Sequence, residues 1–286
     1  MICHGWMDKQ TASSQRFENA TLYTIDTEAE AALSRLWPYI SDLLLTHRSS
    51  GKKRVTKALQ ISGCNPLFIK ASTLESFPSR LRTTLGLRRR SGLYDWPLEE
   101  LNNHVAAQKR TNRLPRLLAY GLVQQRFGIV SEVFLSYEHL TNWIDGYQWL
   151  RMNPTRAQDF VQASLELITQ LDRESIYHLD LWAGNIMIKD DDLSTLKAID
   201  LENCFIGDNA NMSATLGFQF ALLYEHQTHR FINEAEYDHL VNIQLSKMPA
   251  VNLPKFRDFY EYFKHNGAHR KERYLIPKLG NIAIFL

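Results

Sequence analysis

The sequence predicts an α+β fold in two lobes, a small antiparallel sheet lobe and a larger, mainly helical lobe. Strand-like segments separated by turn residues fill most of the first ~135 residues, with one helix among them. Amphipathic stretches with helical spacing dominate from Asn153 onward. The composition shifts near Tyr137–Gly146, which predicts the lobe boundary there. We therefore expect an N-terminal extension at 1–45, a first lobe at 46–136 and a second at 137–286.

The first lobe is expected to be a sheet crossed by one helix. A helical stripe with Pro38 inside it covers Thr27–Leu45, ahead of the lobe. The lobe itself begins with two strands around a turn, and Pro97 then marks the first turn of a helix. Its predicted elements are strands Val55–Ile61 and Leu67–Lys70, the turn Ser62–Pro66, the helix Leu98–Lys109, and strands at 115–121 and 127–135.

The second lobe is expected to open with a helix, because Asn153 is a good N-cap residue and Pro154 suits the first helical position. Two short strands, Asn185–Lys189 and Leu196–Ile199, follow around the acidic turn Asp190–Asp192. Residues 213–264 are predicted to be helical, with stops near Pro249 and Pro254.

Composition and charge exclude several classes of protein. The 286 residues are 44% hydrophobic, which is too apolar for a disordered chain. Lys and Arg total 33 against 31 Asp and Glu, so no nucleic-acid partner is expected. The three cysteines, Cys3, Cys64 and Cys204, form no CxxC pair, which favours a reducing compartment.

The N-terminal stretch, residues 1–10, lacks the apolar core of a signal peptide, and no apolar run is long enough to span a bilayer. The expected location is cytoplasmic, either free or in peripheral contact with the inner membrane.

The chemically informative segment is the pattern H-x-D-x-x-x-x-N, formed by His178, Asp180 and Asn185. A hairpin follows it, and Asp200 comes directly after an apolar strand. Phosphoryl transfer needs a carboxylate that orients the acceptor hydroxyl and takes its proton, and oxygen ligands that hold Mg²⁺. The order helix, loop, strand, acidic turn and strand favours this chemistry over a set of polar caps.

This pattern predicts two partners upstream, a strand lysine for phosphates and a helix glutamate that holds it. Lys70 ends the strand segment Leu67-Phe-Ile-Lys. Glu100 lies near the start of the following helix, with Glu99 as its rival.

On these residues the chain resembles the lipopolysaccharide kinase (Kdo/heptose kinase) family of the protein-kinase-like superfamily, over about residues 50–225. The other matching segments are Gly51–Thr56 in place of a nucleotide loop, Glu100–Val105, Pro115–Gly121 and Ser131–Leu135 as a hinge. The resemblance implies a two-lobed protein-kinase-like fold that uses ATP and Mg²⁺. It implies Asp180 as catalytic base, Asn185 and Asp200 as metal ligands, Lys70 on ATP phosphates and Glu100 paired with Lys70.

The chain departs from the kinase pattern at several positions. No G-x-G-x-x-G precedes Lys70, Leu179 stands before Asp180 where kinases have Arg, and Leu201-Glu202 replaces Phe-Gly. Glu202 is either an extra metal-side carboxylate or a turn residue. These departures point away from an ordinary regulated protein kinase.

The basic insertion at 72–98 has two alternative interpretations. Its arginines are Arg80, Arg82, Arg88, Arg89 and Arg90, with leucines between them. They would either contact anionic lipid or the phosphates of a glycolipid, or form a solvated loop.

The expected function is ATP- and Mg-dependent phosphorylation of a sugar hydroxyl of the lipopolysaccharide inner core, with a glycolipid or sugar acceptor. The alternatives are an aminoglycoside- or choline-type phosphotransferase, a protein kinase, or a pseudokinase scaffold that the missing glycine loop favours.

Overall fold

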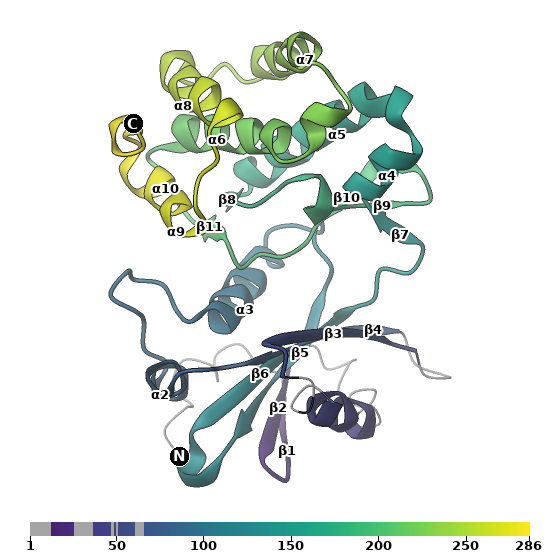
Figure 1. Ribbon diagram of the computed structural model, residues 1–286, viewed down its shortest axis with the longest axis vertical. Coiled ribbons are helices and arrows are strands. Elements are labelled where there is room, and N and C mark those ends of the chain that lie inside the picture. Colours follow the sequence, from purple (N-terminus) through teal and green to yellow (C-terminus); the bar gives the residue numbers. More distant parts are fainter. Residues whose placement is uncertain (1–12, 26–36, 47–48, 50, 61–65) are drawn as a thin grey trace. The chain divides into compact units, whose positions relative to one another are not determined.

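The computed structural model describes residues 13–25, 37–46, 49, 51–60 and 66–286 (Figure 1). The chain forms two compact units, which are Met1–Gln108 with Pro115–Thr141, and Lys109–Leu114 with Asn142–Leu286. The first is a sheet with helices and the second is mainly helical, which confirms the predicted α+β class. Three sequence features lie wholly or mostly outside the described residues. These are the predicted helix at 27–45, of which residues 37–45 are described, the predicted turn at 62–66, of which Pro66 is described, and the two cysteines Cys3 and Cys64.

The first unit is built on a six-stranded antiparallel sheet in the order β1-β2-β5-β6-β4-β3. Its strands are β1 (Ser13–Phe17), β2 (Ala20–Thr24), β3 (Arg54–Leu59), β4 (Leu67–Thr73), β5 (Leu117–Gln124) and β6 (Val130–Glu138). Its helices are residues 37–46, α2 (Phe77–Leu85) and α3 (Trp96–Ala107). The hinge predicted at 131–135 lies inside β6, where those residues pair with β4 and β5.

Strand alternation gives this sheet two apolar faces. One face packs against the helix at 37–46 through Ile40, Leu43 and Leu44. The other packs against α3 through Leu98, Leu101 and Val105. Each face is therefore covered by a helix, so the sheet is buried on both sides.

The predicted N-terminal extension at 1–45 is corrected. β2 pairs with β5 over five residue pairs, so residues 13–24 complete the sheet of the first unit. The helix at 37–46 then supplies one of its two covers. The predicted boundary at 136/137 also moves, because β6 runs on to Glu138 and the first unit ends at Thr141.

The second unit contains two small sheets, β10-β9-β7 and β11-β8, and a set of helices. Its strands are β7 (Trp143–Asp145), β8 (Ile176–His178), β9 (Ile186–Lys189), β10 (Asp192–Ala198) and β11 (Cys204–Ile206). Its helices are α4 (Gly146–Met152), α5 (Ala157–Arg173), α6 (Met212–Glu225), α7 (Glu234–Ser246), α8 (Leu253–His265), α9 (Arg270–Arg273) and α10 (Leu275–Leu279).

Helix α6 forms the centre of this unit, since every residue from Ala214 to Tyr224 is buried. A helix that is apolar on all sides is expected in a core rather than at a surface. Gly217 allows α8 to approach, because an added Cβ there would lie 2.3 Å from the carbonyl oxygen of Phe256. Pro254, predicted as a stop, lies in the first turn of α8 instead, where its missing N–H costs nothing. None of the described helices is long and apolar enough to cross a bilayer.

Candidate active site

In the first unit the structure brings Lys70 and Glu100 together. Lys70 lies on β4 opposite Leu135, and alternation turns it away from the face of Ile69 and Ala71 and toward α3. Its Nζ donates to Oε1 of Glu100 at 2.5 Å. Glu100 lies early in α3, a helix that begins with a proline in its first turn.

The Glu100 carboxylate is buried and has further donors around it. The Tyr137 hydroxyl donates to Oε1 at 3.0 Å, and Nη2 of Arg54 lies 3.8 Å from Oε2. The Arg54 guanidinium also stacks over Trp96, 4.3 Å from the ring centroid. A buried carboxylate is tolerable with this many partners, so the pair fixes the ammonium position on the sheet.

Glu99, the alternative to Glu100 as the partner of Lys70, binds a backbone group instead. Its Oε2 accepts from the backbone N–H of Tyr94 at 2.7 Å, just before α3 begins. It therefore satisfies a backbone donor in the loop that leads into the helix.

In the second unit His178 joins the loop that carries Asp180 to the segment that carries Asp200. The backbone N–H of Asp180 donates to Nδ1 of His178 at 3.2 Å, so the ring proton is assigned to Nε2. Nε2 then donates to the carbonyl of Ile199 at 2.9 Å. Burial lowers the pKa of His178, which favours this neutral form. The histidine is a structural tie.

A backbone hydrogen bond joins the segment that carries Asn185 to the segment that leads into Asp200. The backbone N–H of Ile199 donates to the carbonyl of Asn185 at 3.0 Å. Nδ2 of Asn185 donates to the carbonyl of Asp180 at 2.8 Å, so its amide oxygen is the group that can act as an acceptor or ligand. Asp200 has a φ of 65°, an uncommon region for a residue other than glycine.

Two arginines from the C-terminal segment bind the Asp180 carboxylate. Nη1 of Arg273 donates to Oδ1, and Nη2 of Arg270 donates to Oδ2 at 3.0 Å. Arg273 is a buried residue that also donates to the carbonyls of Leu179 and Ala268, whereas 58% of the Arg270 side chain is exposed. The first arginine holds the loop and the second lies at its surface.

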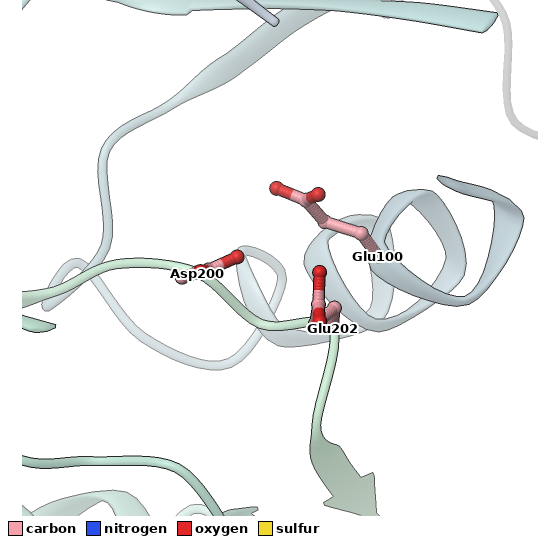
Figure 2. Close-up of side chains that lie close together, drawn as sticks. All are labelled: Glu100, Asp200 and Glu202. Carbon is pink, nitrogen blue, oxygen red and sulfur yellow. The ribbon is translucent and has the colours of Figure 1, made fainter. Parts of the chain in front are cut away.

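Glu202 completes this cluster. Nη1 of Arg270 donates to Oε1 of Glu202 at 2.6 Å, so one guanidinium bridges Glu202 and Asp180. The Tyr274 hydroxyl donates to the carbonyl of Glu202 at 2.6 Å. One carboxylate oxygen of Glu202 lies within 4.8 Å of one of Asp200. Figure 2 shows these two carboxylates on the segment before β11, and that of Glu100 on helix α3.

Behind the loop, Gln219 of α6 links two polar groups. With its amide oriented to satisfy both neighbours, the nitrogen donates to Oδ1 of Asp172 and the oxygen accepts from the backbone N–H of His178, each at 3.2 Å. Burial raises the pKa of Asp172 well above its ordinary 3.8. The buried helix α6 thus supports the backbone at His178, just before Asp180.

Sequence reasoning missed Arg270, Arg273 and Gln219. Arg273 contacts Asp180 across 93 residues, and no spacing rule connects positions so far apart. Gln219 lies in an otherwise apolar stretch, and a polar residue in such a stretch was the one signal available.

No family model matches the chain, and no curated protein matches it by sequence. Solved structures do match, at a distance. One is titled "WaaP in complex with acyl carrier protein", with 17% identity, a TM-score of 0.43, and coverage of 70% of this chain and 77% of that one. Another is titled "Titin kinase and its flanking domains", with 14% identity, a TM-score of 0.41, and coverage of 80% of this chain and 45% of that one.

Proposed function

We propose that the chain is a phosphotransferase of the protein-kinase type that transfers the γ-phosphoryl group of ATP to an alcohol. The observation that carries the proposal is the geometry around Asp180. Its loop is tied by His178 to the segment of Asp200, and Asn185 is held on the same loop by a bond to the Asp180 carbonyl. The Lys70–Glu100 pair of the first unit independently supports it, because phosphoryl transfer uses such a pair on ATP phosphates.

In this proposal Asp180 orients the acceptor hydroxyl and accepts its proton. The hydroxyl oxygen forms a bond to the γ-phosphorus, and the bond from that phosphorus to the β–γ bridging oxygen breaks, so that ADP leaves. Arg273 keeps Oδ1 of Asp180 fixed, so the hydroxyl would approach Oδ2, which also accepts a bond from Arg270. Arg270 shares that side and lies at the surface, so its guanidinium supplies positive charge where phosphoryl charge develops.

The residues present fit a magnesium ion. Mg²⁺ prefers hard oxygen ligands, and it typically takes one or two carboxylates together with phosphates. Asn185 offers its amide oxygen, because its amide nitrogen is used on the Asp180 carbonyl, and Asp200 offers a carboxylate. These two residues would hold the ion. When bound, the ion would neutralise charge on the nucleotide phosphates.

For the acceptor we propose a sugar hydroxyl of the lipopolysaccharide inner core, on Kdo or heptose. Its support is the sequence resemblance and the local charge. Cationic acceptors such as aminoglycosides or choline call for acidic surroundings. The exposed charges conspicuous in the first unit are instead arginines, Arg88–Arg90 among them, which suit an anionic acceptor.

The test is phosphate transfer from labelled ATP, with Mg²⁺, to core glycolipid, and in parallel to an aminoglycoside, choline and a generic protein substrate. Asp180→Asn should lower transfer to the glycolipid by about 10²–10⁴-fold. The matched control is Asp258→Asn on α8, an exposed position where transfer should stay at the wild-type level.

The outcomes separate the alternatives. Transfer to choline or an aminoglycoside in place of the glycolipid would keep the phosphotransferase and replace the acceptor. No transfer, and no thermal stabilisation by millimolar Mg-ATP, would favour a scaffold without catalysis, since a ligand that binds the native state raises its stability. Transfer unchanged in Asp180→Asn would remove that residue from the mechanism.

A further inference from the structure

Helix α2 carries an apolar stripe that faces solvent. Phe77, Leu81 and Leu85 recur every four residues and are 61%, 39% and 39% exposed, while Thr83 and Thr84 are buried. Leu87, just past the αL cap at Gly86, is 50% exposed. This reverses the usual pattern, in which a helix buries its apolar residues and exposes its polar ones.

The turn between β5 and β6 extends the same apolar surface. Phe127 lies in this turn with a φ of 66° and is 98% exposed. The turn lies beside α2, because the Thr84 hydroxyl accepts from the backbone N–H of Val130 at 2.9 Å (Figure 1). Phe77 and Phe127 also line one shallow surface pocket. Two separate segments thus place large apolar side chains on one part of the first unit.

The charge around these side chains is mainly positive, and the flanking acidic residues Glu75 and Asp95 pair with Lys53 and Arg82. Residues 76–94 and 125–129 contain six arginines and no Asp or Glu. Arg82 forms a two-bond pair with Asp95, 2.9 Å at each contact, and Arg80 donates to the carbonyl of Leu74. These two arginines of the predicted basic contact are therefore engaged within the fold. Four others are exposed, and no acidic side chain in the described part of the chain pairs with them: Arg88, Arg89, Arg90 and Arg126. Two of the four also bond to backbone carbonyls, Arg88 to that of Gly92 at 2.7 Å and Arg89 to that of Tyr94 at 3.0 Å. A neutral acceptor leaves the positive charge of each guanidinium uncompensated.

We infer that this surface docks the first unit onto an anionic lipid bilayer. We call it the α2 surface; it consists of Phe77, Leu81, Leu85, Leu87, Phe127, Arg88, Arg89, Arg90 and Arg126. Apolar side chains that enter the boundary between headgroups and acyl chains, ringed by arginines, are what an interfacial anchor requires. Each arginine near an anionic surface adds about 1 kcal/mol, or about fivefold in binding. The inference does not depend on the proposed phosphotransfer.

The test is co-sedimentation of the full chain with vesicles of pure phosphatidylcholine, and with vesicles containing about 30% phosphatidylglycerol. Wild type should bind the anionic vesicles and lose that binding at high salt. The triple variant Arg89→Gln/Arg90→Gln/Arg126→Gln should bind at least tenfold more weakly, and so should Phe127→Ser. Since Phe127 is 98% exposed, its replacement should leave the fold intact, which equal thermal unfolding would verify.

Matched controls come from exposed residues of the second unit. These are the triple variant Arg151→Gln/Arg173→Gln/Arg257→Gln, which removes the same charge, and Ile243→Ser on α7. Both should bind within twofold of wild type. Equal weakening by either control, or no weakening by Phe127→Ser and the first triple, would overturn the inference. The inference would also be overturned if the wild type formed a dimer in the absence of vesicles and Phe127→Ser dissociated it. The surface would then bind a second copy of the chain.

Discussion

Asp180 and Arg273 form an ion pair in which only 9% and 10% of the two side chains are exposed. The arginine comes from α9 and its other bonds end on backbone carbonyls, so the pair fastens the C-terminal segment to the loop of the proposed base. Removing one partner of a buried pair leaves the other charge without compensation, which costs about 3–5 kcal/mol.

Arg273→Gln should therefore lower the free energy of unfolding by about 3 kcal/mol in urea. In the Asp180→Asn background, Arg273→Gln should cost at least ~1 kcal/mol less, because that background has no Asp180 carboxylate to be left unpaired. Lys271→Gln, at an exposed position two residues away, serves as the control. Equal costs in both backgrounds would show that the arginine acts through its backbone contacts alone.

Arg270 is the exposed member of the arginine pair, and its removal should affect turnover more than stability. Exposed ion pairs contribute about 0–1 kcal/mol, so Arg270→Gln should shift the melting temperature by only a few degrees. Without the guanidinium, the positive charge that bridges the carboxylates of Asp180 and Glu202 is lost. We expect kcat to fall about tenfold or more. Arg270→Lys should recover part of it, and a rise in kcat with Arg270→Gln would instead identify the contact as inhibitory.

Glu100 and Glu99 are adjacent acidic residues with separable tasks. Glu100→Gln weakens the contact to Lys70 and should raise the KM for ATP about tenfold or more, since the ammonium would lose its fixed position. Glu99→Gln should leave that KM unchanged and reduce stability by ~1 kcal/mol, because it weakens the bond to the Tyr94 N–H. Steady-state kinetics and thermal unfolding of both variants check this. A similar KM for ATP in the two variants would contradict the assignment.

Local patterns predicted much of the fold. The hairpin of β9 and β10 was predictable because an apolar strand, three aspartates and a second strand follow one another, and Asp190 and Asp191 take the positive φ that such a turn needs. The strand of Lys70 and the helix of Glu100 were equally local. Residues 13–24 were not, since β2 joins the sheet through β5, about 100 residues later, and pairing over that distance leaves no trace in composition.

The site divides in the same way. The proposed site residues of the second unit lie close together in the sequence, so their order and spacing were enough to predict them. They are His178, Asp180, Asn185 and Asp200. The residues that bind this loop, Arg273 and Gln219, come from α9 and α6. Only tertiary packing brings them next to it. Sequence spacing reveals which groups form a proposed site, whereas the groups that orient them become visible only in the folded chain.

Asp172 should give the fold a dependence on pH. Burial raises its pKa well above 3.8, and its Oδ2 has no hydrogen-bond partner within the described residues. A carboxyl whose folded pKa is raised contributes stability that is complete below the unfolded pKa and is lost as pH rises through the folded value. Asp172→Asn keeps the shape and removes the titration. Its stability relative to wild type should therefore increase from pH 5 to pH 8, by about 1–2 kcal/mol in urea unfolding. A pH-independent difference would show that the residue does not titrate between those values.

Gly217 sets the distance between α6 and α8, and its replacement by alanine tests that packing. Alanine favours a helix over glycine by up to ~1 kcal/mol, so an uncrowded site would gain stability. Here the added Cβ would lie 2.3 Å from the backbone oxygen of Phe256 and 3.2 Å from Cβ of Phe259, and a backbone atom cannot rotate away. Overpacking of this kind costs about 1–3 kcal/mol or more, which exceeds the gain in propensity. Gly217→Ala should therefore lower the melting temperature by several degrees, whereas Gly267→Ala, with its nearest contact at 3.7 Å, should not. An unchanged melting temperature for Gly217→Ala would mean that α8 moves away from α6 at little cost.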